Sequence, residues 1–520
     1  MKTLLFLHTV IHLKPKQIFY QIKYRLCNKE TPNKYFNHSI KEKNYTPFIK
    51  KQQCYQNNIF TFLNIKDYFH KWDDIRYGML WSYNLNYMDW LQQPNIKLKD
   101  GIFWINKFIE DFSENNIGKA PYTIALRGIN WIKFIIENQK ELSKEYLVKW
   151  NSSLYSQYIL LTKKLEYHLL GNHLLEDAYS LFFAAIYFTD YSFYKTASNL
   201  LKKELKEQIL NDGAHYEQSP MYHCILLERL LDCYNLSINN IQFNNQSEIN
   251  NFLKKIIIKM LGHLDSICYV DKTYPLFNDS AINIAPSVTE LYLYAKKMNI
   301  QWTPIQLKEC GYRKFYSSNM DIEAIIDIGN ITASYQPGHS HADTFNYELR
   351  IKNQPFIIDT GISTYNKTPR RQYERSTASH NTVTIEDKDS SEVWGGFRVG
   401  KRAQTYIIID SINKVVAKHN GFGKNKIHKR SFDLNNNFFT IKDYISTDKE
   451  AISYIHLSPE IKILNCENNI ITTDRAQIEI KFHENIIIKE DMVSSEYNVL
   501  KKNKVIEIHF NKNLQYTIKI

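Results

Sequence analysis

Histidines and carboxylates gather between residues 338 and 398, in a stretch whose other residues alternate like those of β-strands. His339 and His341 stand two residues apart, so their side chains would share one face of an extended strand. With Asp359 and His380 they offer the nitrogen and oxygen donors that zinc prefers, and an imidazole can also take up a proton. The pattern indicates a metal site or a proton-transfer site. A hydrogen-bonded polar corner beneath a loop is the alternative.

Arginines add positive charge near this stretch and earlier in the chain. Arg370, Arg371 and Arg375 form either a solvated basic face or a clamp for an anion, because guanidinium groups bind carboxylates through two parallel hydrogen bonds. Arg127, inside a helical pattern, is interpreted as a packing feature that carries one functional charge. Arg127 and Arg375 are predicted to contact substrate.

Two polar clusters lie where the pattern turns helical. Asn172 begins the first, with His173 and Glu176 close behind it, and the alternative role for Asn172 is a helix N-cap. The second spans residues 212–223, where Ser219 and Pro220 make a favourable helix start. Polar and aromatic residues crowd the same entrance: His215, Tyr216, Glu217, Tyr222 and His223.

The residue types narrow the chemistry. The chain shows no Ser-His-Asp elbow, phosphate-binding glycine loop or dinucleotide fingerprint. Tyr, His, Asn and Arg suit the removal of a proton beside a carboxylate, as at C5 of a uronic acid. His or Tyr can act as base, Asn or His can hydrogen-bond the carboxylate, and Tyr can protonate the departing O4. The outcome would be β-elimination.

Helical periodicity extends from about residue 68 to 300. The expected helices are 81–91, 101–115, 122–138, 143–165, 172–189, 193–210, 219–236, 248–269 and 285–298. Beyond residue 319 the period becomes two, as in 322–328, 345–351, 405–409, 438–445 and 505–510. About a dozen antiparallel strands would form a β-sandwich. The predicted fold is α+β and multidomain: a basic, aromatic extension (1–67) packed on the helices, a helical domain (68–315) and a β-sandwich (316–520).

Composition limits the partners. A chain of 520 residues is long enough for two or more domains, and its net charge of +12 favours anionic partners. Nucleic acid is excluded, because no zinc-finger spacing, compact basic helix or RNA-binding aromatic signature is present. Residues 16–26 have helical spacing with a basic face, which favours packing on the main body, with peripheral membrane contact as the alternative. No stretch reaches the ~18 apolar residues of a transmembrane helix.

The seven cysteines are odd in number, widely spaced and without a C-x-x-C pair, so a disulfide framework is not expected. His8 and His12 interrupt the apolar run at the N-terminus, and no small-residue cleavage site precedes Lys14. A cytoplasmic location is expected, with a periplasmic one as the alternative.

In chain order, these motifs resemble the heparinase II/III family of polysaccharide lyases. The similar stretches are residues 172–176, 212–223, 275–280, 338–343 and 394–398. The resemblance implies an incomplete (α/α) toroid followed by an antiparallel β-sandwich, with substrate held between them. Secreted members carry a clear signal peptide. The start of this chain is more similar to members without one, which are associated with surface-polysaccharide biosynthesis.

By the same resemblance, Asn172 would neutralise the uronate carboxylate, Tyr222 would act as general acid, and His339 would be the base. The role of base stays open between Tyr222 and His339, and Tyr222 is chosen over Tyr216 because it follows Ser219-Pro220. His173 and Glu217 are predicted to contact substrate. A metal found in some relatives would correspond to a structural divalent ion, zinc or calcium, on His341, Asp359 and His380.

The predicted function is a polysaccharide lyase that cleaves an acidic, 1,4-linked uronic-acid polysaccharide and is linked to surface-polysaccharide metabolism. One rival is a glycoside hydrolase on the same helical toroid, which would recruit two carboxylates from Glu176, Glu217 and Asp279. The other is a non-catalytic glycan-binding or assembly protein. The sequence leaves open the sugar, the exo or endo mode and the oligomeric state.

Overall fold

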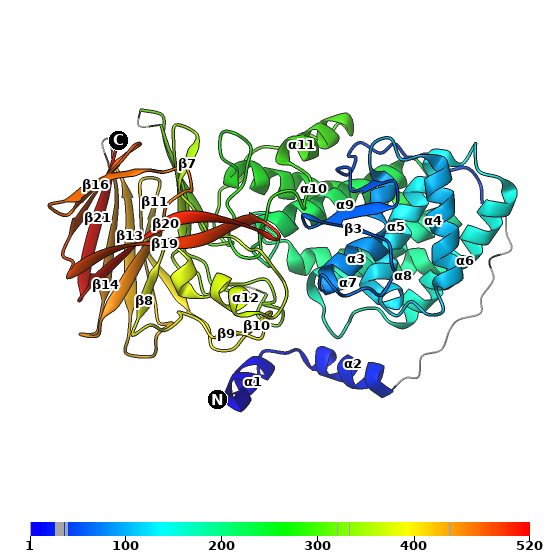
Figure 1. The fold of residues 1–520 in the computed structure, drawn as a ribbon. Helices are drawn as coiled ribbons and strands as arrows, with labels where there is room; N and C mark the ends of the chain where they lie inside the picture. The colour runs from blue at the N-terminus through cyan, green and yellow to red at the C-terminus, as the bar shows by residue number, and fades with distance from the viewer. Residues whose placement is uncertain (1, 27–35, 37–39, 320, 332, 436–437) are drawn as a thin grey trace.

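The computed structural model describes residues 2–26, 36, 40–319, 321–331, 333–435 and 438–520. Two large parts lie side by side (Figure 1): a mainly helical part from α3 (Met79–Tyr87) to α11 (Val288–Lys297), and a sheet-rich part that begins at β4 (Tyr312–Ser317). Helices come first and sheets second, so the predicted fold class is confirmed. The change falls between Lys297 and Tyr312, where no regular element is present.

The helical part has an inner and an outer layer. α7 contacts α5 and α9, and each of these inner helices contacts the helix that follows it. Of the 18 residues of α7, 17 are buried, whereas α8 buries 9 of 18. A helix that is apolar on all sides lies inside, and a helix with one apolar face lies outside. The helices are α4 (Leu98–Asp111), α5 (Pro121–Asn138), α6 (Lys144–Lys163), α7 (Gly171–Phe188), α8 (Tyr191–Gln208), α9 (Pro220–Ile238) and α10 (Gln246–Ile267).

Three antiparallel sheets make up most of the second part. Their strand orders are β11-β12-β13-β14-β21-β18-β17-β16, β19-β20-β15-β8 and β4-β5-β6-β7. All three contribute to one apolar core, for example through Phe315, Phe432 and Ile506. Alternation fixes which face is buried: β13 pairs with β14 so that Phe432 lies opposite Ile441, and both side chains are buried.

The strand bounds are β5 (Ile322–Asp327), β6 (Tyr347–Ile351), β7 (Gln354–Ile357), β8 (Val383–Ile385), β9 (Val393–Trp394), β10 (Arg398–Val399), β11 (Thr405–Ser411), β12 (Lys414–His419), β13 (His428–Leu434), β14 (Phe439–Ile445), β15 (Ala451–His456), β16 (Ile463–Glu467), β17 (Ile470–Thr473), β18 (Gln477–Lys481), β19 (Asn485–Glu496), β20 (Val499–Phe510) and β21 (Asn513–Lys519). A short helix, α12 (Pro369–Glu374), lies between β7 and β8. The predicted strands coincide with β5, β6, β11, β14 and the second half of β20.

The N-terminal extension contains helices and strands that the sequence periodicity did not reveal as distinct elements. A small sheet, β1 (Tyr55–Gln56), β2 (Ile59–Phe62) and β3 (Ile65–Tyr68), follows two helices, α1 (Lys2–Val10) and α2 (Pro15–Leu26). α2 packs against the helical domain, where the Gln17 side chain donates to the Leu169 carbonyl. α1 instead contacts β10 of the sheet-rich part, so the extension reaches both domains and not the helical one alone.

A hairpin joins the two parts on another side. β19 and β20 extend toward the helical domain (Figure 1). At its tip, the Asn64 amide donates to the Tyr497 carbonyl at 3.0 Å, and the Asn498 amide donates to the Leu63 carbonyl at 2.8 Å.

Over the described residues, none of the helices is long and apolar enough to cross a bilayer. The cysteines in the described chain are free thiols, namely Cys54, Cys224, Cys233, Cys268, Cys310 and Cys466.

Candidate active site

His339 sits in the loop between β5 and β6 and points toward the helical domain. Its Nδ1 lies 2.9 Å from Asp279 Oδ2, and the Asp279 backbone N–H donates to the His339 carbonyl at 3.1 Å. A carboxylate accepts a proton-bearing nitrogen, so this contact places the proton on Nδ1 and leaves the Nε2 lone pair available. Asp279 therefore orients His339 as a base.

Asp279 is itself held by charge. Both of its oxygens accept from Arg371, at 2.5 and 2.7 Å, and Oδ1 also lies 2.8 Å from His341 Nε2. Burial raises the pKa of Asp279, but Arg371 and the two histidines outweigh it and hold the pKa well below its usual range. The carboxylate is ionised and cannot readily donate a proton.

Asn172 is the second residue of α7, and its side chain does not cap the helix. Leu170 occupies the cap position, without a capping hydrogen bond from its side chain. Gly171 takes a positive φ of 60°, and a Cβ there would come within 2.8 Å of Glu217 Oε1. The Asn172 amide is thus free to face His339: Nδ2 lies 3.5 Å from His339 Nε2, and Oδ1 is buried without a hydrogen-bond partner. An unpaired buried amide oxygen is uncommon and marks a place for a ligand.

Tyr222 occupies the first turn of α9. Ser219 caps that helix by accepting the Tyr222 backbone N–H, and Pro220 follows as its first residue, as predicted. The Tyr222 ring lies 4.0 Å from the His339 ring, centroid to centroid, and its hydroxyl lies 3.3 Å from the Tyr365 hydroxyl. Burial raises the pKa of Tyr222 well above 10, so the phenol keeps its proton at neutral pH. That suits a general acid.

Glu217 lies against both Asn172 and His339. Its Oε1 accepts the Asn172 backbone N–H at 3.1 Å, and its Oε2 lies 3.6 Å from His339 Nε2 without a hydrogen bond. Burial raises the pKa of this carboxyl, although His339 opposes the shift. Glu217 therefore lies beside the catalytic group that the sequence predicted and holds the start of α7 in place.

His173 lines the same region with an aromatic wall. Its Nδ1 lies 3.0 Å from Glu166 Oε2, and its ring lies 4.7 Å from that of Tyr122. Burial lowers the pKa of His173, but Glu166 outweighs burial and the net pKa is raised. A partly exposed imidazole beside an aromatic ring can contact a sugar.

The arginines predicted to contact substrate are placed elsewhere. Arg127 is fully buried within the helices, where it donates to Gln157 and to the Gly118 carbonyl. Arg375 is also fully buried and donates to the Ser340 carbonyl. Neither guanidinium is accessible to a ligand, because both side chains turn inward and donate to groups inside the protein. The proposed basic face is absent here as well, since Arg371 binds Asp279 and Arg370 binds Glu374.

The predicted metal ligands are buried, but their donor atoms do not all lie within 4.8 Å of one another in the described chain. His380 Nδ1 is 2.9 Å from Asp359 Oδ2, and the His341 and His380 ring centroids are 5.2 Å apart. His341 Nδ1 and His380 Nε2 are buried without partners. These donor types suit zinc, although Asp359 already accepts from Asn346 and the Gly361 backbone.

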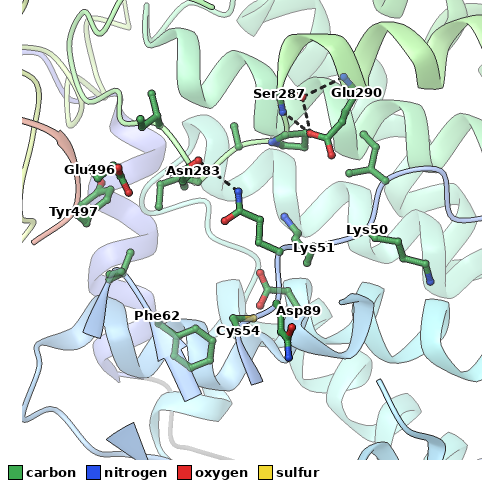
Figure 2. A pocket seen from close by; sticks show the side chains of 18 of the residues that line it. Lys50, Lys51, Cys54, Phe62, Asp89, Asn283, Ser287, Glu290, Glu496 and Tyr497 are labelled. Carbon is green, nitrogen blue, oxygen red and sulfur yellow. Dashed lines mark hydrogen bonds between the residues drawn. The ribbon is translucent and has the colours of Figure 1, made fainter. Parts of the chain in front are cut away.

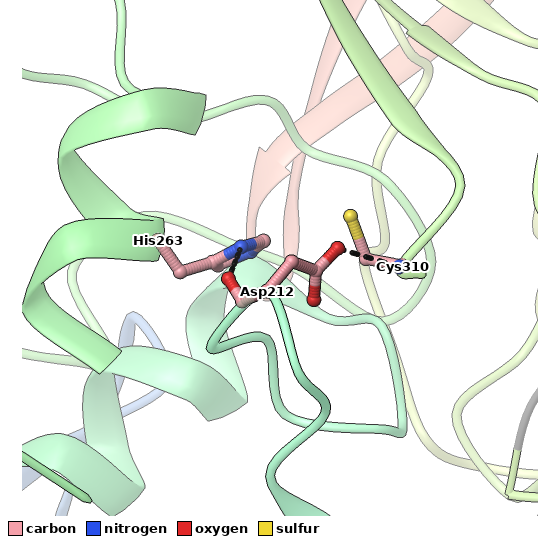
Figure 3. Close-up of side chains that lie close together, drawn as sticks. All are labelled: Asp212, His263 and Cys310. Carbon is pink, nitrogen blue, oxygen red and sulfur yellow. Dashed lines mark hydrogen bonds between the residues drawn. The ribbon is translucent and has the colours of Figure 1, made fainter. Parts of the chain in front are cut away.

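A tighter group lies at the junction between domains (Figure 3). Asp212, His263 and Cys310 bring their ligand-type atoms within 4.8 Å of one another, and in the described chain no other such trio is found. Asp212 Oδ2 accepts the backbone N–H groups of Lys308 and Cys310, and His263 Nδ1 donates to the Asp212 carbonyl. These bonds anchor the segment between α11 and β4.

Two tyrosines near the site could not be identified from the sequence around them. Tyr365 comes from the loop after β7, and its ring lies 5.3 Å from that of Tyr497 at the tip of the β19–β20 hairpin. Nothing in the neighbouring sequence distinguishes either tyrosine from the other 34. Only the folded chain brings them to Tyr222.

A cavity of about 510 Å³ lies on the far side of that hairpin tip. Figure 2 shows Lys50 and Lys51 on one side of it and Glu496 and Tyr497 on the other. Asn172, Tyr222 and His339 do not line it. Two of its lining residues, Leu63 and Tyr497, belong to the same apolar cluster as Tyr222, so the cavity adjoins the site there.

Two family models together match nearly the whole chain. "Heparinase II/III N-terminus" matches residues 42–302, and "Heparinase II/III-like, C-terminal" matches residues 300–520. The boundary between the two models lies in the segment between α11 and β4.

Curated relatives and a solved structure agree with these models. A "Heparin-sulfate lyase" of Pedobacter heparinus is 25% identical over 351 residues, which cover 62% of this chain and 50% of the relative. One of the same name from Bacteroides stercoris is 22% identical over 330 residues, 58% of this chain and 48% of the relative. The chain thus matches about half the length of each. The "Crystal Structure of Heparinase III" superimposes with a TM-score of 0.67 at 14% identity, covering 97% of this chain and 88% of that one, which shows the shared fold.

Proposed function

The chain belongs to the heparinase II/III family, and on that premise we propose that it is a polysaccharide lyase acting on an acidic, uronate-containing glycan. One observation carries the proposal. Asn172 and Tyr222 from the helical domain meet His339 from the sheet-rich domain, within 3.5 Å and 4.0 Å respectively. The relatives are heparin-sulfate lyases, and this similarity and the net charge of +12 support an acidic substrate.

In the mechanism that we propose, each proton transfer belongs to one residue. His339 Nε2 takes the C5 proton of the uronate, the electron pair forms the C4–C5 double bond, and the C4–O4 bond breaks. Tyr222 gives its phenolic proton to the departing O4, for which its raised pKa suits it. Asn172 Nδ2 donates to the uronate carboxylate, which stabilises the negative charge that develops there.

The environment of the carboxylates disfavours the hydrolase alternative. A glycosidase needs a carboxylic acid and a carboxylate that face the scissile bond. The Asp279 carboxylate is already paired with Arg371, His339 and His341, so it is not available to a substrate. Glu176 is buried beside Arg229, at 3.5 Å. Of these three carboxylates, only Glu217 lies beside His339 without an ion pair to a lysine or arginine.

We propose that the enzyme acts in surface-polysaccharide metabolism. We also propose that His341, Asp359 and His380 hold a structural divalent metal. The two unpaired imidazole nitrogens support the metal. Elemental analysis of the purified protein should find about one zinc or calcium ion per chain. His380→Ala should abolish this content, and a metal-free wild-type protein would contradict the proposal.

Incubation with uronate polymers tests the activity. The unsaturated product conjugates its new double bond with the carboxylate, so ultraviolet absorbance should rise. Tyr222→Phe should lower kcat by about 10²–10⁴-fold, as expected for loss of a general acid. Tyr216→Phe is the matched control, because the Tyr216 hydroxyl is hydrogen-bonded to the Tyr335 hydroxyl. Saturated products, or equal activity in wild type and Tyr222→Phe, would overturn the proposal.

A further inference from the structure

The two N-terminal helices turn their polar side chains inward. On α1, His8 Nδ1 lies 2.8 Å from Glu392, and Trp394 donates to Thr9 Oγ1 at 3.1 Å. On α2, the Tyr24 hydroxyl donates to the Leu165 carbonyl at 2.6 Å. A helix that covers a globular protein normally packs its apolar face against the body. α1 and α2 instead contact the body through polar side chains.

Their apolar side chains consequently face outward. Eight large apolar residues on this segment are between 40% and 78% exposed: Leu4, Phe6, Leu7, Ile11, Ile18, Phe19, Ile22 and Leu26. Leu4, Leu7 and Ile11 follow helical spacing, as do Ile18 and Ile22. A stripe of this kind in contact with water is unfavourable unless another apolar phase covers it.

The charge of this segment indicates what kind of surface covers its apolar side chains. Residues 1–26 contain five basic residues, Lys2, Lys14, Lys16, Lys23 and Arg25, and no Asp or Glu. Lys23 and Arg25 are exposed beside the stripe on α2. A second copy of the same segment would bring like charges together. An acidic polysaccharide would satisfy the charge but would leave the aliphatic side chains in water.

We propose that α1 and α2 bind the surface of an anionic lipid bilayer, with the apolar stripe in the headgroup region and the exposed Lys23 and Arg25 on lipid phosphates. Amphipathic helices with leucine or phenylalanine on one face and lysine or arginine on the other bind membranes in this way. Because the inward face is fixed to both domains, binding would hold the whole enzyme at the membrane in one orientation. This inference does not depend on the lyase activity.

Vesicle co-sedimentation of the full chain tests the inference. The protein should sediment with vesicles that contain phosphatidylglycerol and phosphatidylcholine, bind phosphatidylcholine alone much more weakly, and lose affinity as salt rises. Phe19→Ser with Ile22→Ser should weaken binding at least tenfold, and Lys23→Gln with Arg25→Gln should weaken it about tenfold.

The matched control is Ile412→Ser with Leu464→Ser, which removes two exposed apolar residues from the sheet-rich domain and should leave vesicle binding unchanged. Unchanged lyase activity in solution would show that each variant is folded. Absence of binding to anionic vesicles would overturn the proposal. So would binding that Phe19→Ser with Ile22→Ser leaves intact, or a dimer that this variant dissociates without any vesicle binding by the wild type.

Discussion

At the scale of single residues, function depends on which protons are fixed. Asp279 fixes the proton of His339 on Nδ1, while burial keeps the proton on Tyr222. In the proposed mechanism, the base and the acid are therefore held in complementary protonation states before substrate arrives. The apparent equivalence of Tyr222 and His339 as bases is resolved, in the proposed mechanism, by these two environments.

Glu176 should make stability depend on pH. Burial raises its pKa to about 7, although Arg229 opposes the shift. Between the ordinary pKa of 4.5 and about 7, the folded chain retains a proton that the unfolded chain loses, so this contribution to stability falls as pH rises. The free energy of unfolding, measured with urea at pH 5 and pH 8, should fall by up to about 3 kcal/mol more in wild type than in Glu176→Gln.

Glu141→Gln provides the control for this comparison, since Glu141 is exposed and should leave the pH profile unchanged. A Glu176→Gln variant with the wild-type profile would show that another group carries the dependence.

At the scale of elements, backbone geometry presents the site. The positive φ of Gly171 lets α7 begin without using Asn172 as a cap, and Ser219 starts α9 so that Tyr222 lies in its first turn. The β19–β20 hairpin supplies Tyr497 behind Tyr365. Helix starts and one hairpin tip therefore position the aromatic side of the site.

Loosening the hairpin tip should affect substrate binding more than stability. Asn64 and Asn498 both have positive φ, which glycine also adopts, so Asn64→Gly with Asn498→Gly removes the side-chain hydrogen bonds to Tyr497, Glu496 and Leu63 without straining the backbone. We expect KM for the polymer to rise several-fold, with about 1–3 kcal/mol of local contact energy lost at the tip. Steady-state kinetics measures the change.

Asn353→Gly is the control, because Asn353 has positive φ in the distant β6–β7 turn. An unchanged KM in the double variant, or an equal rise in Asn353→Gly, would argue against a role for the tip.

At the scale of the whole molecule, one ion pair joins the domains at the site. Arg371 on α12 binds Asp279 in a loop of the helical domain, and both side chains are fully buried. The same carboxylate holds His339, so this one ion pair contributes both to docking of the domains and to the position of His339.

Arg371→Met should destabilise the protein by about 3–5 kcal/mol, because it leaves the Asp279 charge buried without its main partner. Arg371→Lys should recover part of the loss, since lysine keeps the charge but cannot make the bidentate contact. Thermal unfolding and kcat should change together across this pair. Full activity and stability in Arg371→Met would refute the coupling.

The sequence alone determined the features that follow from local periodicity and from contiguous motifs. Helical and strand segments, their order, the family and the Ser219-Pro220 helix start all depend on neighbours within a few residues. Tertiary structure decided the rest, because hydrogen bonds between distant segments leave no periodic trace. It buried Arg127 and Arg375, brought Tyr365 to Tyr222, and paired Asp279 with Arg371 across 92 positions. Candidate reactive residues could be named from the sequence, whereas the contacts that set their protonation required the fold.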